Sequence, residues 1–129
     1  MAVRIVRLGS SRARAEGLRL GTVRRPPRGV RKTEYASGNW FDVWLPNLSP
    51  SAGLMQATNI LEDRSGWKRF ARSFRRELAK PDASHLLDAL AALSHSTNFS
   101  VGCYCDDEQW CHRSILRAEL TARGADLQD

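Results

Sequence analysis

The residues best suited to chemistry lie together near the C-terminal end of the sequence. They are three thiols, an imidazole and a guanidinium: Cys103, Cys105, Cys111, His112 and Arg113. A thiol can act as a nucleophile, an imidazole as a general acid or base, and a guanidinium as a partner for phosphate or carboxylate. We therefore expect Cys111 and His112 to be catalytic and Arg113 to bind an anion.

Two other interpretations of the same segment stay open. In the first, four side chains bind zinc: Cys103, Cys105, Cys111 and His112. The spacing argues against zinc, because Cys-x-Cys is tighter than usual and adjacent cysteine and histidine residues do not easily reach one ion. In the second, the segment is inert: Cys103 is a small core residue and Arg113 pairs with an acid of residues 106–108.

The local pattern predicts how these residues are positioned. Residues 98–105 form a short apolar run typical of a strand, which would place Cys103 and Cys105 on the same face. Residues 111–123 return to helical spacing, and Gly124 is a typical helix stop. A strand followed by a helix N-terminus is where open α/β sheets bind ligands, and amides there favour anions.

The rest of the chain predicts further elements by the period of its apolar residues. Alternating patterns predict strands at 3–8, 18–23 and 40–45. Helices are predicted to start at 49–51, to run from Trp67 until before Pro81, and to follow a cap at Asp82 or Ser84. We expect one α/β domain over residues 1–129, with a largely parallel sheet flanked by helices in a Rossmann-like layering.

Positive charge is concentrated in the first quarter of the sequence. Residues 1–32 hold ten of the 20 lysines and arginines but only one of the 14 acids. Such a block either attracts phosphate-bearing partners or is simply a solvated surface. The loop at 24–32 contains two consecutive prolines, so we expect it to be a fixed basic loop.

This basic loop and the Cys-His-Arg helix start can be joined into one hypothesis. If both lie at the carboxyl edge of the sheet, Arg24, Arg28 and Lys32 would form an anion pocket together with Arg113. The expected ligand is a nucleotide, a nucleic-acid end or a phosphorylated metabolite, and the protein could be an enzyme on such a compound. The alternative is a nucleic-acid-binding or zinc-binding module without catalysis. Because residues 17–34 contain no aromatic side chain, we favour a small anionic ligand over nucleic acid.

The chain also resembles the YeaO-like family, a domain of unknown function. Five segments carry the resemblance: 16–20, 24–33, 44–51, 67–70 and 103–113. The resemblance implies an α/β fold and brings no established activity. Three positions depart from the family pattern, because relatives often have Asp at Val23, Trp at Pro26 and an acid at Cys105.

The remaining expectations concern location and cofactors. No apolar stretch is long enough to span a bilayer, and the N-terminus lacks the pattern of a secretory signal. We therefore expect a cytoplasmic protein with no membrane partner and with reduced thiols. No cofactor is expected apart from zinc as the alternative, and neither catalysis nor the oligomeric state follows from the sequence.

Overall fold

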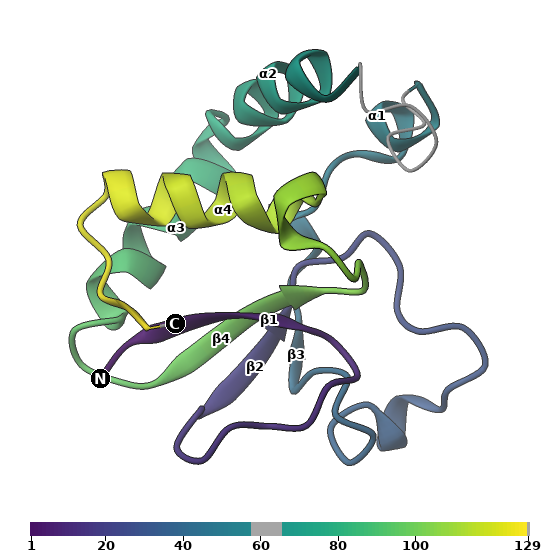
Figure 1. Ribbon diagram of the computed structural model, residues 1–129, viewed down its shortest axis with the longest axis vertical. Helices are drawn as coiled ribbons and strands as arrows, with labels where there is room; N and C mark the ends of the chain where they lie inside the picture. The colour runs from purple at the N-terminus through teal and green to yellow at the C-terminus, as the bar shows by residue number, and fades with distance from the viewer. Residues whose placement is uncertain (58–65, 129) are drawn as a thin grey trace.

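The computed structural model describes residues 1–57 and 66–128 and contains a five-stranded sheet (Figure 1). The strands are β1 (Val3–Arg7), β2 (Leu18–Gly21), β3 (Val43–Trp44), β4 (Phe99–Cys103) and β5 (Leu127–Gln128). Their order across the sheet is β3-β2-β4-β1-β5, and every neighbouring pair is parallel. The expected α/β fold with a parallel sheet is therefore confirmed.

The helices connect these strands and supply most of the core. They are α1 (Ala52–Ala57), α2 (Trp67–Leu78), α3 (Pro81–Leu93) and α4 (His112–Ala122), with short 3-10 turns at Lys32–Glu34, Pro46–Leu48 and Glu108–Trp110. In Figure 1, α2, α3 and α4 lie together on one side of the sheet. Phe70, Leu87 and Ile115 of these helices share one buried cluster with Phe99 and Val101 of β4.

The chain between β1 and β2 packs against the opposite face of the sheet. Because side chains alternate along a strand, Ser100 points away from the helices and donates a hydrogen bond to Glu16 at 2.7 Å. Glu16 in turn forms an ion pair with Arg19 of β2 at 2.8 Å, and both side chains are almost completely buried. A polar network therefore fixes the loop after β1 against the sheet.

The strand and helix boundaries depart from the sequence expectations at three places. The strand expected at 40–45 is reduced to Val43–Trp44, because Phe41 is buried in a second apolar cluster instead. The strand β5 was not expected at all. The helix α3 begins at Pro81 after Lys80, so neither Asp82 nor Ser84 is its N-cap; proline is well suited to the first helical position.

The other predicted elements are confirmed closely. The strands β1 and β2 and the helix α2 lie within the predicted ranges, and Gly124 follows α4 with a φ of 79°. Across residues 1–57 and 66–128, no helix combines the length and the apolar character that crossing a membrane requires.

Candidate functional site

The sheet register brings three loops to one edge of the molecule. Arg7 at the end of β1 pairs with Cys103 at the end of β4, and Gly21 at the end of β2 pairs with Gly102. The segments that follow these strands therefore start side by side. The basic loop and the Cys-His-Arg segment both begin at this carboxyl edge, where parallel sheets bind their ligands.

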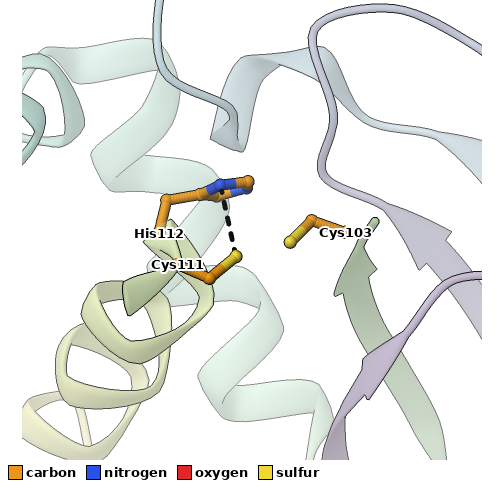
Figure 2. Close-up of side chains that lie close together, drawn as sticks. All are labelled: Cys103, Cys111 and His112. Atoms are coloured by element: carbon orange, nitrogen blue, oxygen red, sulfur yellow. Dashed lines mark hydrogen bonds between the residues drawn. The ribbon is translucent and has the colours of Figure 1, made fainter. Parts of the chain in front are cut away.

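Three chemically active side chains meet at the junction between β4 and α4. Figure 2 shows Cys103, Cys111 and His112 facing one another, and their sulfur and nitrogen atoms lie within 4.8 Å of one another. The Cys111 Sγ and the His112 Nδ1 are 3.8 Å apart. Cys111 is in an extended conformation, with φ −124° and ψ 151°, while His112 is the first residue of α4. This change of backbone conformation lets two adjacent side chains point toward each other. The sequence argument had held that adjacent cysteine and histidine residues do not easily reach one ion.

The His112 ring is held in one orientation. Its Nε2 lies 2.7 Å from the Thr22 carbonyl oxygen, which can only accept a hydrogen bond, so Nε2 carries the proton and donates it. The ring packs against Phe74 of α2 in a T-shaped contact at a centroid distance of 5.6 Å. In the neutral ring, Nδ1 therefore presents a lone pair toward Cys111.

Arg113 is the second residue of α4 and is 4% exposed. Its Nη2 donates to the Cys105 carbonyl at 2.7 Å, and its Nε has no hydrogen-bond partner within the described residues. The neighbouring acid Glu108 pairs instead with Arg117 at 2.6 Å. Within residues 1–57 and 66–128, no carboxylate forms an ion pair with Arg113, and Glu108 acts on it through its charge alone.

The thiols provide the negative charge that this buried cation faces. Hydrogen bonds from Cys103 and Cys111, together with the charge of Arg113, lower the pKa of Cys105 to about 3. The hydrogen bonds that Cys103 shares with Cys105 and Cys111, and then its burial, raise the pKa of Cys103. Burial disfavours the charged form of Arg113, but Cys103 and Cys111 raise its pKa overall. The arrangement therefore supports one thiolate beside one guanidinium.

A pocket of about 330 Å³ opens at this cluster. The residues 103–105 and His112 line one part of it, and Val23, the start of the basic loop, Pro50 and α1 line the rest. Cys111, at 1% exposure, is not among the lining residues, whereas Cys105 is half-buried. A ligand in this pocket would therefore meet the sulfur of Cys105 or Cys103 before that of Cys111.

The structure separates the four cations of the expected anion site. Arg24 lines the pocket, but its guanidinium donates to the carbonyls of Pro50, Pro46 and Ser49 at 3.1, 3.2 and 3.2 Å. Arg28 lines a second, neighbouring pocket. Lys32 is exposed on a 3-10 turn and lines neither pocket. Arg113 is buried and lines neither pocket, so Arg28 and Lys32 are not brought together with it.

Sequence reasoning missed three groups that shape the site. Arg25 and Tyr104 line both pockets, and the Tyr104 hydroxyl donates to the Arg25 carbonyl at 2.9 Å. Arg25 lies in the basic loop, so its charge was a usable signal, whereas nothing marked Tyr104. The Thr22 carbonyl had no sequence signal, because every residue carries a backbone oxygen.

Comparison with known proteins places this site within a family. A family model for DUF488-N3a, described as the active DUF488-N3 subclade, matches residues 3–124, which span β1 to α4 and include every residue of the thiol cluster. No curated protein and no solved structure matches the chain. Because the match covers nearly the whole chain, the protein belongs to the DUF488-N3a family, a domain of unknown function.

Proposed function

We propose that the protein is an enzyme that binds a small phosphorylated compound in the 330 Å³ pocket and attacks it with the sulfur of Cys105. One observation carries the proposal: Cys105 lines the pocket and is the half-buried one of three interacting thiols, and the charge of buried Arg113 acts on it. The description of the subclade as active agrees with a catalytic role. The closer YeaO-like membership and the cytoplasmic location remain predictions.

The proposal assigns the attack to Cys105 instead of Cys111 because of access. Cys105 lines the pocket, whereas Cys111 is buried against His112 and Cys103. In the reaction, the sulfur forms a bond to an electrophilic centre of the substrate as the bond to the leaving group breaks. The leaving group departs with the electron pair and takes a proton from water, and the resulting hydroxide releases the product from sulfur. Cys103, Cys111 and His112 are positioning residues in this scheme.

The basic loop supports the choice of a phosphorylated ligand. Arg25 lines the pocket, is exposed, and forms no ion pair within the described residues. Arg24 is fixed beside it by three backbone carbonyls, which neutralise none of its charge. The positive charge of two arginines that line a pocket of this size favours a small anion.

Alkylation of the reduced protein tests this proposal. With iodoacetamide at neutral pH and peptide mass spectrometry as readout, Cys105 should react at least about tenfold faster than Cys103 and Cys111. Inorganic phosphate should slow the labelling of Cys105, and the Arg25→Ala variant should lose that protection. The Arg31→Ala variant is the matched control, because Arg31 is exposed in the same basic loop and lines neither pocket, and it should keep the protection. Fastest labelling at Cys111, or no difference among the three thiols, would overturn the assignment.

A second candidate, a zinc-binding role, is favoured by the convergence of Cys103, Cys111 and His112. Zinc–sulfur and zinc–nitrogen bonds of about 2.3 and 2.1 Å place tetrahedral ligand atoms roughly 3.5 to 3.8 Å apart, and the Cys111 and His112 ligand atoms are 3.8 Å apart. A carbonyl acceptor on the far nitrogen is the usual support of a zinc-bound histidine, and the Thr22 carbonyl provides one.

Native mass spectrometry separates the two candidates. The thiol enzyme predicts that the native and denatured masses of the reduced protein agree. The zinc site predicts an excess equal to one zinc ion that the Cys103→Ser variant loses. A bound zinc would remove the thiol mechanism from this cluster.

A further inference from the structure

A second pocket lies beside the thiol pocket and has no role in the proposed reaction. Its volume is about 630 Å³. Two stretches of the chain and two single side chains line it: 7–10, 25–28, Trp40 and Tyr104. Arg7 ends β1 and Tyr104 follows β4, so this pocket also lies at the carboxyl edge of the sheet. Arg25 and Tyr104 form its boundary with the thiol pocket, because they line both.

The second pocket is strongly basic. Arg7, Arg25 and Arg28 all line it. Arg25 and Arg28 are exposed and form no ion pair in the described part of the chain. Arg7 pairs with Asp106 at 2.7 Å, but both side chains are more than half exposed, and such a surface pair is weak and easily exchanged for a stronger anion. Pro26 and Pro27 restrict the loop between Arg25 and Arg28, which lowers the entropy lost when both bind one ligand.

Two aromatic rings stand beside these cations. Trp40 and Tyr104 form an edge-to-face pair with centroids 6.0 Å apart. Both rings pack against the second apolar cluster but are only partly buried, so part of each ring stays accessible. The Tyr104 hydroxyl is fixed on the Arg25 carbonyl, which holds that ring at the boundary between the two pockets. Aromatic faces next to arginines are the combination that binds a base by stacking and its phosphate by charge.

We infer that the second pocket binds a nucleoside phosphate, with the base against Trp40 and Tyr104 and the phosphate on Arg25 and Arg28. This goes beyond the four-cation site expected from sequence, since Lys32 and Arg113 lie outside this pocket and the aromatic rings were not part of it. It rests on the proposed function in one respect: because Arg25 lines both pockets, the phosphate end of the bound nucleotide would lie next to the thiol pocket. Binding itself does not depend on catalysis.

Calorimetry with three probes tests the ligand class. Adenosine monophosphate should bind at least about tenfold more tightly than ribose 5-phosphate, which lacks the base, and than adenosine, which lacks the phosphate. Equal binding of adenosine monophosphate and ribose 5-phosphate would overturn the aromatic subsite. Equal binding of adenosine and the monophosphate would overturn the arginine subsite.

A pair of charge-reversal variants tests the location. Arg28→Glu should weaken binding of adenosine monophosphate at least about tenfold. Arg31→Glu is the matched control, because Arg31 lies in the same basic loop, is exposed and lines neither pocket. It should weaken binding by less than about threefold, through the general field alone. Equal losses in both variants would mean that the ligand responds to the overall charge and that this pocket is not its site.

A further comparison identifies the source of the nucleotide. A short single-stranded oligonucleotide with a 5′-phosphate carries the same chemistry as the free monophosphate at its end. Binding of both with similar affinity, each weakened by Arg28→Glu, supports the pocket and makes a nucleic-acid end an acceptable source. Binding of the oligonucleotide alone, unaffected by Arg28→Glu, would overturn the inference.

The outcome also separates this inference from the proposed function. The Cys105→Ser variant should bind adenosine monophosphate as the unaltered protein does, because the sulfur does not line the second pocket. If the monophosphate binds but does not slow alkylation of Cys105, the second pocket stands and its link to the thiol is wrong. If inorganic phosphate protects Cys105 while no nucleotide binds, the proposed function stands and this inference fails.

Discussion

At the scale of single residues, His112 shows how a backbone group can define a reactive side chain. The Thr22 carbonyl accepts from Nε2, and Phe74 limits the tilt of the ring. The other nitrogen is left as a base or ligand beside Cys111. The chemistry of the imidazole is therefore set by a loop that follows β2, far away in the sequence.

Two substitutions of His112 test the hydrogen bond between its Nε2 and the Thr22 carbonyl. In His112→Gln, the amide nitrogen can still donate to Thr22, whereas His112→Leu leaves a buried carbonyl without a partner. We expect His112→Leu to lower the free energy of unfolding by about 1 to 3 kcal/mol more than His112→Gln, measured by urea denaturation. Equal stability of the two variants would contradict the hydrogen bond.

The residue types that meet at the candidate site could be predicted from the sequence, but their exposure could not. Thiols, imidazole and guanidinium are rare enough that Cys103–Arg113 stands out by type alone. Which sulfur reaches a pocket depends on where α4 begins, and the helix start at His112 buries Cys111. The hydrogen bonds of the Arg24 guanidinium could not be predicted either, because its partners are three backbone carbonyls.

At the scale of elements, periodic segments were predictable and short ones were not. The helix α2 repeats its apolar residues over 12 positions, and four of them are buried as the period requires. The strands β3 and β5 are two residues long and have no room for a period. Their pairing is decided by neighbours in space, Leu20 for Val43 and Val3 for Leu127.

Gly17 and Gly29 both have a positive φ but differ in the space around them, and substituting each one measures how closely the chain before β2 approaches Asn98. Gly17, just before β2, has a φ of 79°, and a Cβ there would lie 1.9 Å from the Asn98 carbonyl oxygen. Gly29 has a φ of 77° and open space around it. Gly29→Ala should cost about 1 kcal/mol of stability from strain alone, and Gly17→Ala at least about 2 kcal/mol more, because the backbone must shift. Urea denaturation of both variants measures the difference, and equal losses would show that the close approach to β4 is absent.

At the scale of the whole molecule, one buried ion pair joins segments from across the chain. Arg19 donates to Glu16 and also to the carbonyls of Ser10 and Asn39, at 2.9 and 2.8 Å. Glu16 accepts from Ser100 of β4 as well. The face of the sheet away from the helices is thus held by charge and hydrogen bonds. Breaking such a pair by removing one partner costs roughly 3 to 5 kcal/mol.

This pair predicts how stability depends on pH. Burial opposes the charged form of Glu16, but hydrogen bonds from Arg19 and Ser100 lower its pKa from 4.5 to about 2. A carboxyl with a lowered pKa stabilises the fold above its unfolded pKa and loses that contribution as the pH falls through the folded one. Between pH 4.5 and 2 we expect a loss of at most about 3 kcal/mol.

The Glu16→Gln variant isolates this effect. It should be less stable at neutral pH, and its free energy of unfolding should fall less steeply below pH 4.5 than that of the unaltered protein. Since Asp42 also has a lowered pKa, opposed by burial but favoured by Arg12, some acid dependence remains in both proteins. Parallel acid profiles of the two proteins would contradict the assignment to Glu16.

The order of strands in the sheet also has a consequence for how the chain folds as it is made. The strand β4 lies between β1 and β2, so each of them lacks its principal neighbour until residues 99–103 have been synthesised. Pairing of Val3 with Phe99 closes a very long loop, and such non-local contacts make folding slow. We expect the N-terminal three quarters to leave the ribosome without a completed sheet, so that the thiol site and its neighbouring basic pocket form together, in the last step, when β4 is inserted.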